Sequence, residues 1–430
     1  RLLNDGLYSL RVTFTDSSGR KSQDTTLVLV RNRPNTYLSC ETCLDCSLLL
    51  SWPGSSVNLT RDLTDFSKAC VRISGDNTSF DCNQKGFKQN VNAWDPPGIF
   101  ANSERVKIRN CEFTNMSNPL ILFYPGKRII AENNLITNPV YGITLASVQN
   151  VSLVENKVLV DDYSFFRRGL YFLDLPTKLS QDSLLDYSDH SIDTSNTING
   201  KPIYYLFNQY GTVLSNLEVG GVFIRGGANN TIDNLRIVGG DGINIFASSN
   251  NRVLNNYLEN NSYALTLGPK SNDNLIQSNI FKNYQFYAIV GENQLEEVPS
   301  VSNKIFDNSF ILDVRDRYGA SFVGIYFEKN FLNTEIRNSN FVNSLHEGVA
   351  IAVGAASGLI QGNRIQGQET GIALRVTSGF PLILRNNQIR SNKIGLDIAY
   401  QSSPGDFIFQ HNTIANNEKQ VRASLSDSTL

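Results

Sequence analysis

Four ionisable residues, His346, Glu347, Glu369 and Lys393, occur at a spacing that could support acid–base chemistry. His346, Glu369 and Lys393 each lie two residues before a glycine. If those glycines mark a structural repeat, an imidazole, a carboxylate and an ammonium group would stack about 5 Å apart, within reach of proton transfer. The alternative is an exposed polar column in which unlike charges stack favourably. We favour this second interpretation and treat the four residues as weak catalytic candidates.

Cleavage of a glycosidic bond requires two carboxyl groups about 5–9.5 Å apart. Asp241 lies between two glycines in the same predicted register as Glu347. The two carboxyl groups would be four repeats, or about 19 Å, apart, so they could not cooperate. The sequence leaves enzymatic activity undecided, and an enzyme of this kind would be a glycoside hydrolase or a polysaccharide lyase.

All six cysteines lie in one short stretch near the N-terminus, at Cys40, Cys43, Cys46, Cys70, Cys82 and Cys111. An even, clustered count predicts three disulfides and an oxidising compartment, although sequence alone does not choose among fifteen pairings. The first three cysteines have a spacing that also suits a metal site. No histidine precedes His190, so a fourth ligand is missing and we favour disulfides.

Asparagine makes up about 50 residues, far above its ordinary share. The sequence contains six N-x-[ST] acceptor motifs, which permit N-glycosylation in an exported protein. They are Asn58, Asn77, Asn115, Asn150, Asn229 and Asn260. We expect Asn77 and Asn229, in turn-like contexts, to be the best acceptors.

Charge and hydropathy exclude two classes of partner. The net charge is −2 and only 18% of the residues are charged, so nothing indicates nucleic-acid binding. No apolar run approaches the length of about 20 residues that a membrane span requires.

A repeat of about 22–24 residues organises most of the chain. A small residue followed by an aliphatic one recurs from Gly142-Ile143 to Gly395-Leu396. An asparagine with an apolar residue two positions later precedes each step, as in Asn279 and Phe281. The segments between them alternate in hydrophobicity, and none shows a helical period. This pattern predicts a β-solenoid.

We expect an all-β, right-handed parallel β-helix of about a dozen coils with a disulfide-rich N-terminal cap. Asparagine tolerates left-handed turns, and stacked asparagines can form an amide ladder along the coils. The predicted inward column is Ile243, Leu265, Ile289, Ile325, Val349, Ile372 and Leu396.

Residues 7–15 and 25–30 alternate around a polar turn and predict a short β-hairpin. The segment resembles the last two strands of an immunoglobulin-like or PKD-like domain. Residues 196–267 resemble the NosD-type β-helix repeat, and their most specific run is Asn199-Gly200-Lys201-Pro202-Ile203-Tyr204-Tyr205. That repeat belongs to the carbohydrate-binding and sugar-hydrolase β-helices, and the resemblance covers roughly residues 55–417.

The NosD family is associated with copper, whose ligands are His, Met or Cys. This chain has one methionine, Met116, and three scattered histidines, His190, His346 and His411. We therefore expect neither a metal site nor another cofactor.

We divide the chain into residues 1–35 (the end of an immunoglobulin-like domain, or a donated hairpin), 36–111 (the cap and first coils), 112–417 (the β-helix) and 418–430 (a tail). Insertions are expected near 161–199, which is rich in aromatic residues, and near 313–320, which is charged.

The primary functional hypothesis is an extracellular, cell-surface structural protein of a surface layer, filament or adhesin. It would assemble with itself or with other surface subunits, and residues 1–35 are the candidate contact. The first alternative is a polysaccharide-binding or polysaccharide-cleaving domain, and the second is a trimeric viral receptor-binding spike.

Overall fold

A computed structural model describes residues 6–15, 17–30, 37–64, 66, 68–89, 96–160, 167–173, 189–291, 299–313, 322–376, 381–400 and 407–425. Apart from an N-terminal hairpin, the described residues form right-handed parallel β-helix coils, about 13 turns in all, with one short helix, as the sequence predicts. The chain divides into two compact units: unit 1 is Arg1–Val158 with Leu170–Asp174, and unit 2 is Leu159–Gly169 with Leu175–Leu430. The boundary falls within β17 (Lys157–Leu159) and β18 (Arg168–Leu173).

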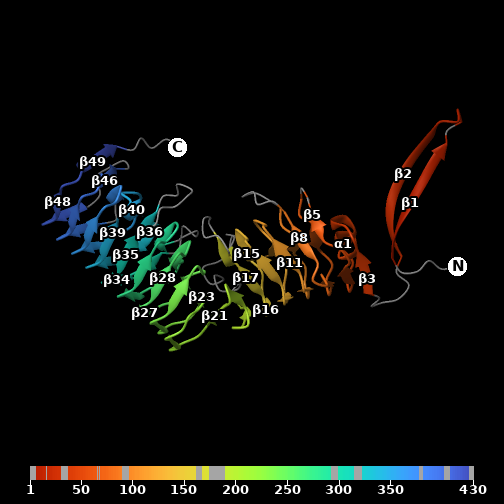
Figure 1. Cartoon of the computed structure of the whole chain (residues 1–430), viewed down its shortest axis with the longest axis horizontal. Coiled ribbons are helices and arrows are strands. Elements are labelled where there is room, and N and C mark those ends of the chain that lie inside the picture. Colours follow the sequence, from red (N-terminus) through yellow and green to blue (C-terminus); the bar gives the residue numbers. More distant parts are fainter. Residues whose placement is uncertain are drawn as a thin grey trace. The chain divides into compact units, whose positions relative to one another are not determined.

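Unit 1 begins with an antiparallel hairpin of β1 (Gly6–Thr15) and β2 (Lys21–Val30), drawn in red in Figure 1. Its coils contain three parallel sheets. The first holds β3 (Tyr37–Cys40), β4 (Ser56–Leu59), β7 (Ser79–Asp81), β10 (Lys107–Arg109), β13 (Ile130–Glu132) and β16 (Ser152–Val154). The second holds β5 (Leu63–Thr64), β8 (Gly86–Lys88), β11 (Glu112–Thr114) and β14 (Leu135–Thr137). The third holds β6 (Val71–Ile73), β9 (Ile99–Ala101), β12 (Leu120–Phe123) and β15 (Tyr141–Ala146).

Disulfides fasten the first coils of unit 1. Cys40–Cys46 and Cys43–Cys70 hold α1 (Cys43–Leu49), and Cys82–Cys111 joins two successive coils. No cysteine is free. The disulfide prediction is therefore confirmed, and the metal alternative for the first three cysteines is wrong.

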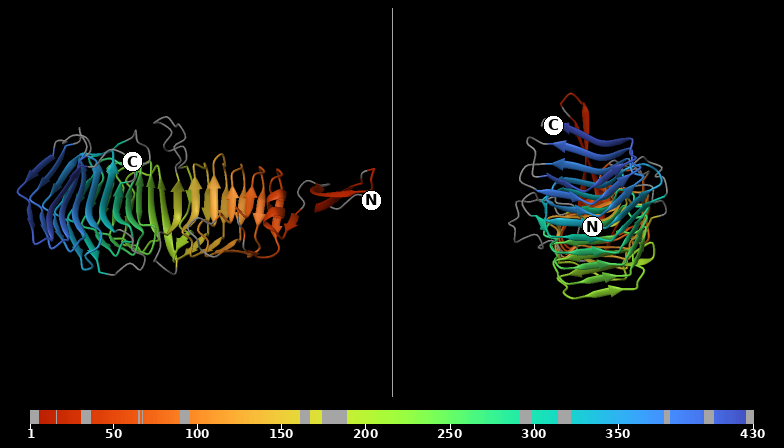
Figure 2. Two further views of the ribbon diagram at one scale, coloured as in Figure 1. Left: turned by 90° about the horizontal axis from the view of Figure 1, so that it is seen from above. Right: turned by 90° about the vertical axis from the view of Figure 1, so that its left-hand side faces the viewer.

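Unit 2 carries three sheets, here called S1, S2 and S3, whose strands stack coil upon coil (green to blue in Figure 2). S1 holds β21 (Lys201–Phe207), β23 (Gly221–Arg225), β26 (Ile243–Phe246), β29 (Tyr263–Leu267), β32 (Tyr287–Gly291), β36 (Val323–Lys329), β40 (Val349–Ala355), β43 (Thr370–Val376), β46 (Ile394–Tyr400) and β49 (Lys419–Leu425). S2 holds β22 (Val213–Ser215), β24 (Thr231–Asp233), β27 (Arg252–Leu254), β30 (Leu275–Gln277), β34 (Lys304–Phe306), β38 (Thr334–Arg337), β41 (Gly358–Gln361), β44 (Leu382–Arg385) and β47 (Phe407–Gln410). S3 holds β25 (Arg236–Val238), β28 (Tyr257–Glu259), β31 (Ile280–Lys282), β35 (Ser309–Leu312), β39 (Asn340–Asn343), β42 (Arg364–Gln366), β45 (Gln388–Arg390) and β48 (Thr413–Ala415).

Four short strands of unit 2 lie outside this regular stacking. They are β19 (Ser191–Ile192), β20 (Thr197–Ile198), which pairs antiparallel with β21, and the parallel pair β33 (Ser300–Val301) and β37 (Phe331–Leu332). Residues 419–425 form β49 beside β46, although the sequence predicts a tail there. Only Val421 interrupts the polar residues at the start of that strand, so its apolar signal is weak.

The core of unit 2 is filled by aligned aliphatic columns. Ile243, Leu265, Ile289 and Ile325 pair in succession along S1, as the sequence predicts. The next residue in this column is Ile351, not Val349. Val349 instead pairs with Thr370, and each of these residues lies two positions before the column residue of its strand, Ile351 or Ile372. The turn before β40 spans residues 344–348, whereas the turn before β43 spans only 367–369, so the repeat shifts by two residues there.

The small-residue marker arises at the corner between S3 and S1. A Cβ atom on Gly371 would lie 2.7 Å from Cγ2 of Ile389, and a Cβ atom on Gly395 would lie 2.6 Å from Cγ2 of Ile414. Each of these isoleucines is an inward residue of an S3 strand. A larger side chain at the marker would overlap the core, and this explains the recurrence of Gly and Ala.

Asparagine stabilises the corners in two ways. Exposed corner residues such as Asn255 and Asn386 adopt positive φ angles, which asparagine tolerates. Asparagines that are buried, apart from the half-buried Asn412, form the predicted amide ladder before the S3 strands. Asn256, Asn279 and Asn308 are joined by Nδ2 to Oδ1 bonds of 2.9 and 3.0 Å, and Asn363, Asn387 and Asn412 by bonds of 3.0 and 2.8 Å.

Candidate binding pocket in unit 2

The three residues predicted to stack, His346, Glu369 and Lys393, do not form one column. Pairing of Val349 with Thr370 places Gly348 beside Glu369, with Lys393 on the next coil. His346 lies in the lengthened turn with φ of 58°, two residues out of that register. His346, Glu369 and Lys393 are exposed and Glu347 is half-buried. The predicted stacking of the imidazole on Glu369 is therefore wrong, and the structure provides no enclosed acid–base site at these positions.

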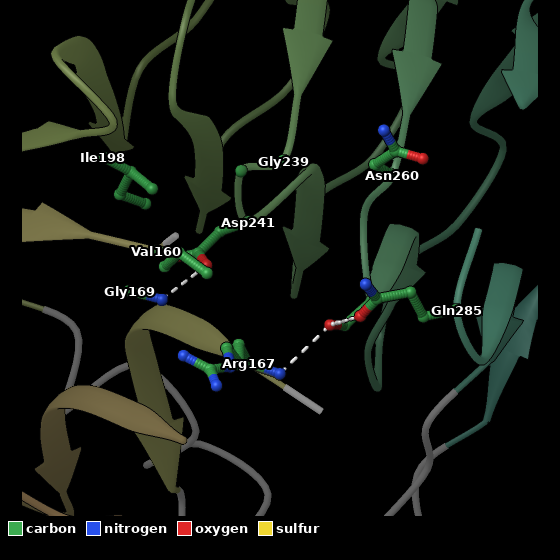
Figure 3. A pocket seen from close by; sticks show the side chains of 10 residues that line it. Val160, Arg167, Gly169, Ile198, Gly239, Asp241, Asn260 and Gln285 are labelled. Carbon is green, nitrogen blue, oxygen red and sulfur yellow. Dashed lines mark hydrogen bonds between the residues drawn. The ribbon is translucent and has the colours of Figure 1, made fainter. Parts of the chain in front are cut away.

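A small polar pocket in unit 2 surrounds Asp241, whose side chain is only 7% exposed (Figure 3). Arg167 and Gly169 also line this pocket. Oδ1 of Asp241 accepts a hydrogen bond of 2.6 Å from the backbone N–H of Gly169. The backbone N–H of Arg167 donates to Oγ of Ser262 at 3.1 Å, and that hydroxyl donates to Oε1 of Gln285 at 2.9 Å. Residues 167–169 are thus joined to the neighbouring coils by two backbone N–H donors, those of Arg167 and Gly169.

The turn at Asn199 and Gly200 forms the adjoining wall. Both residues have positive φ, 50° and 73°, and connect the antiparallel β20 and β21. Oδ1 of Asn199 accepts from the N–H of Val160 at 2.8 Å, and its Nδ2 donates to the carbonyl of Gly239 at 3.0 Å. The run that carries the strongest family resemblance is therefore a structural junction beside the pocket.

A cation–aromatic column lies next to the pocket. The guanidinium of Arg168 lies 4.0 Å from the ring centre of Tyr263. The ring of Tyr263 lies 5.4 Å from that of Tyr287, and Tyr287 lies 5.2 Å from Tyr326. The three tyrosines come from successive strands of S1, β29, β32 and β36. No pattern in the sequence indicates this column, since Arg168 and Tyr263 are far apart in the chain.

The pocket can bind but offers little for acid–base catalysis. Asp241 is the one carboxylate among its described lining residues, and the cavity volume of about 10 Å³ suits a single water molecule or hydroxyl group. A glycosidase pair would need a second carboxyl group. The polar lining is suited to anchoring a hydroxyl-rich ligand at the surface.

The remaining predicted site residues are distributed over the coils. Asn77, Asn115, Asn150 and Asn229 are exposed at corners with positive φ. The other two acceptor motifs differ: Asn260 is half-buried and lines the pocket, and Asn58 is half-buried within β4. Glycosylation at all six remains a prediction. Much of the predicted insertions, 161–166, 174–188 and 314–320, lies outside the described residues.

Comparison with family models supports the architecture. Residues 184–319 and 311–430 match the family described as "Right handed beta helix region". Residues 69–201 match the family described as "Periplasmic copper-binding protein (NosD)". A search of curated proteins found no match.

Solved structures with a similar fold include an alginate lyase from Paenibacillus sp. str. FPU-7, at 10% identity and a TM-score of 0.33, covering 90% of this chain and 98% of that one. DFA-IIIase from Arthrobacter chlorophenolicus A6 without its lid matches at 12% identity and a TM-score of 0.33, covering 80% and 85%. The Streptococcus pneumoniae surface protein and adhesin PfbA matches at 10% identity and a TM-score of 0.31, covering 90% and 91%.

The donor set of this chain does not fit copper. All six thiols are in disulfides, and the thioether of Met116 is buried with 1% exposure. Throughout the described ranges, no three His, Cys, Asp or Glu residues gather into a group that could hold a metal ion. No step of the proposed function therefore involves copper.

Proposed function

This chain belongs to the right-handed β-helix family, and from that premise we propose that it is an exported surface scaffold that joins a partner β-structure through its N-terminal hairpin. The three disulfides indicate an extracellular or periplasmic compartment. Within the described part of the chain, no helix is long and apolar enough to cross a membrane. The cell surface is the location that we propose.

The hairpin carries the proposal. β1 and β2 pair along ten residues each, and among the described residues neither strand pairs with any other. Leu10, Val12 and Phe14 are 51, 37 and 60% exposed and alternate along β1. A two-stranded hairpin is at best marginally stable in water. Its outer edges can add to another sheet, and its apolar residues would be buried on doing so.

The test compares the full chain with a variant lacking residues 1–35 and with the triple variant L10T/V12T/F14T. Electron microscopy and light scattering at several concentrations would measure assembly. We expect ordered assemblies, or a complex with a partner β-domain, that both variants abolish. As a control, V213T and Y210S remove exposed apolar groups in unit 2. Discrete single particles in every sample, with no hairpin-dependent partner, would refute the scaffold role.

A second candidate function is polysaccharide binding at the Asp241 pocket. The observation in its favour is the polar pocket itself, where a buried carboxylate, a hydroxyl and amide groups converge. Glycan screening of the wild type against D241N would test it, since loss of the carboxylate should weaken binding without changing assembly. If screening reveals cleavage, E347Q and E369Q test the predicted catalytic residues, and sugar release unaffected by either would remove them.

A further inference from the structure

We propose that the corner between S2 and S3 in the C-terminal coils of unit 2 binds a linear polysaccharide that carries carboxylates. The arginine corner, as we call it, consists of Arg364, Arg385 and Arg390. It lies on a different part of unit 2 from the Asp241 pocket and does not depend on the hairpin assembly. It shares only its ligand class with the second candidate function.

Strand pairing brings the three arginines together. Arg364 in β42 is the pairing partner of Gln388 in β45, and Gln366 is the partner of Arg390. Arg385 in β44 is the partner of Gln361. Neighbouring strands lie about 4.8 Å apart, and residues two apart on a strand are separated by about 7 Å. The arginines therefore occupy two successive coils around one corner, each opposite a glutamine.

These arginines lack acidic partners in the described structure. Nε of Arg385 donates to Oε1 of Gln361 at 3.0 Å, and Nη2 of Arg364 donates to Oε1 of Gln366 at 3.4 Å. Arg364 and Arg390 are exposed, and Arg385 is half-buried. The outward residues of β41, β42, β44, β45, β47 and β48 include no Asp or Glu. The corner is therefore a local concentration of positive charge on a chain whose net charge is −2.

Several other outward cations of unit 2 have acidic partners. Lys282 lies 3.4 Å from Glu259 and 3.6 Å from Asp313. Arg337, one coil before the corner, is paired with Glu335 at 2.7 Å. Three neighbouring arginines without such partners repel one another, and an external anion would relieve that repulsion. Arginine binds carboxylates with paired, parallel hydrogen bonds, which distinguishes this surface from one of lysines.

An apolar strip beside the arginines indicates the kind of anion. Leu359, Ile383 and Ile408 pair in succession on S2, two residues before Gln361, Arg385 and Gln410. Ile408 is 41% exposed, and the other two are half-buried. A sugar ring could rest its C–H face on this strip, its hydroxyls meeting glutamine amides and its carboxylate an arginine.

Affinity electrophoresis and calorimetry with polygalacturonate and alginate, at 50 and 500 mM NaCl, would test the proposal. Fully methyl-esterified polygalacturonate provides the same backbone without charge. We compare the wild type with R364Q/R385Q/R390Q and with R72Q/R105Q/R128Q, which removes three exposed arginines of unit 1. We expect wild type and control to bind at least one polyuronate, more weakly in high salt. The corner variant should bind about tenfold more weakly, given the modest energy of each exposed ion pair.

Four results would overturn the proposal: no binding of either polyuronate, equal binding of the methyl ester, a corner variant that binds as tightly as the control, or tighter binding of a DNA oligonucleotide. Circular dichroism would verify that each variant folds. D241N and the chain without residues 1–35 should bind polyuronates as wild type does. Their behaviour separates failure of this proposal from failure of the pocket or of the hairpin assembly.

Discussion

The amide ladder of S3 provides a sharp test of what holds the coils together, through the substitution Asn387→Ala. Asn387 is 1% exposed. Its Oδ1 accepts from the backbone N–H and from Nδ2 of Asn363, both at 3.0 Å. Its Nδ2 donates to the carbonyl of Ile360 at 2.9 Å and to Oδ1 of Asn412 at 2.8 Å. The substitution removes all four of these hydrogen bonds, because each involves the Asn387 side chain.

The expected cost follows from the groups left without partners. Nδ2 of Asn363 keeps its bond to the carbonyl of Ile336. The backbone N–H of Asn363 and the carbonyl of Ile360 lose the bonds that Asn387 makes to them. Each buried group left without a partner costs about 1–3 kcal/mol, so we expect a loss of about 2–6 kcal/mol.

The neighbouring Asn386→Ala is the matched control. Asn386 is exposed at a corner with φ of 56°. Its substitution should cost only the strain of alanine at positive φ, about 1 kcal/mol. Because a solenoid opens locally, hydrogen exchange of peptides covering β42 and β45 is the appropriate assay, supported by urea unfolding. If hydrogen exchange of these peptides accelerates no more in N387A than in N386A, the amide ladder does not stabilise the stacking of the coils.

Three further outcomes follow from the structure. Replacing Cys82 and Cys111 by serine should cost about 3–4 kcal/mol, since the disulfide closes a loop of 29 residues, and thermal unfolding with and without reductant measures this. Gly371→Ala should cost about 1–3 kcal/mol through overlap with the core, whereas Gly86→Ala, whose new atom would meet nothing closer than 3.5 Å, should be nearly neutral in denaturant midpoint. Burial raises the pKa of Tyr284; its folded pKa lies above the unfolded value of about 10, so stability should fall as pH rises past 10 and Y284F should remove that loss.

The architecture was predictable from the repeat, because every coil of a solenoid has nearly the same local sequence pattern. Each coil buries one aliphatic column and turns at asparagine corners, so the columns from Ile243 to Ile325 and the ladder of Asn256 and Asn279 are visible as periodic residues. The presence of disulfides was likewise predictable, because all six cysteines lie in one short stretch of the sequence. Such features depend on neighbours one coil away, and their sequence spacing is nearly constant.

The roles of the irregular segments depend on contacts that exist only in the folded chain. Two extra residues in the turn before β40 move His346 out of line with Glu369, and no periodic signal distinguishes Gly348 as a turn glycine from the marker glycines. The contact of Gly169 with Asp241 joins residues 72 positions apart. The arginine corner likewise depends on pairing between coils, because Arg385 and Arg364 face one surface only when their strands are in register. The local sequence pattern determines the repeat, whereas the pairing of strands between coils determines which side chains contact one another.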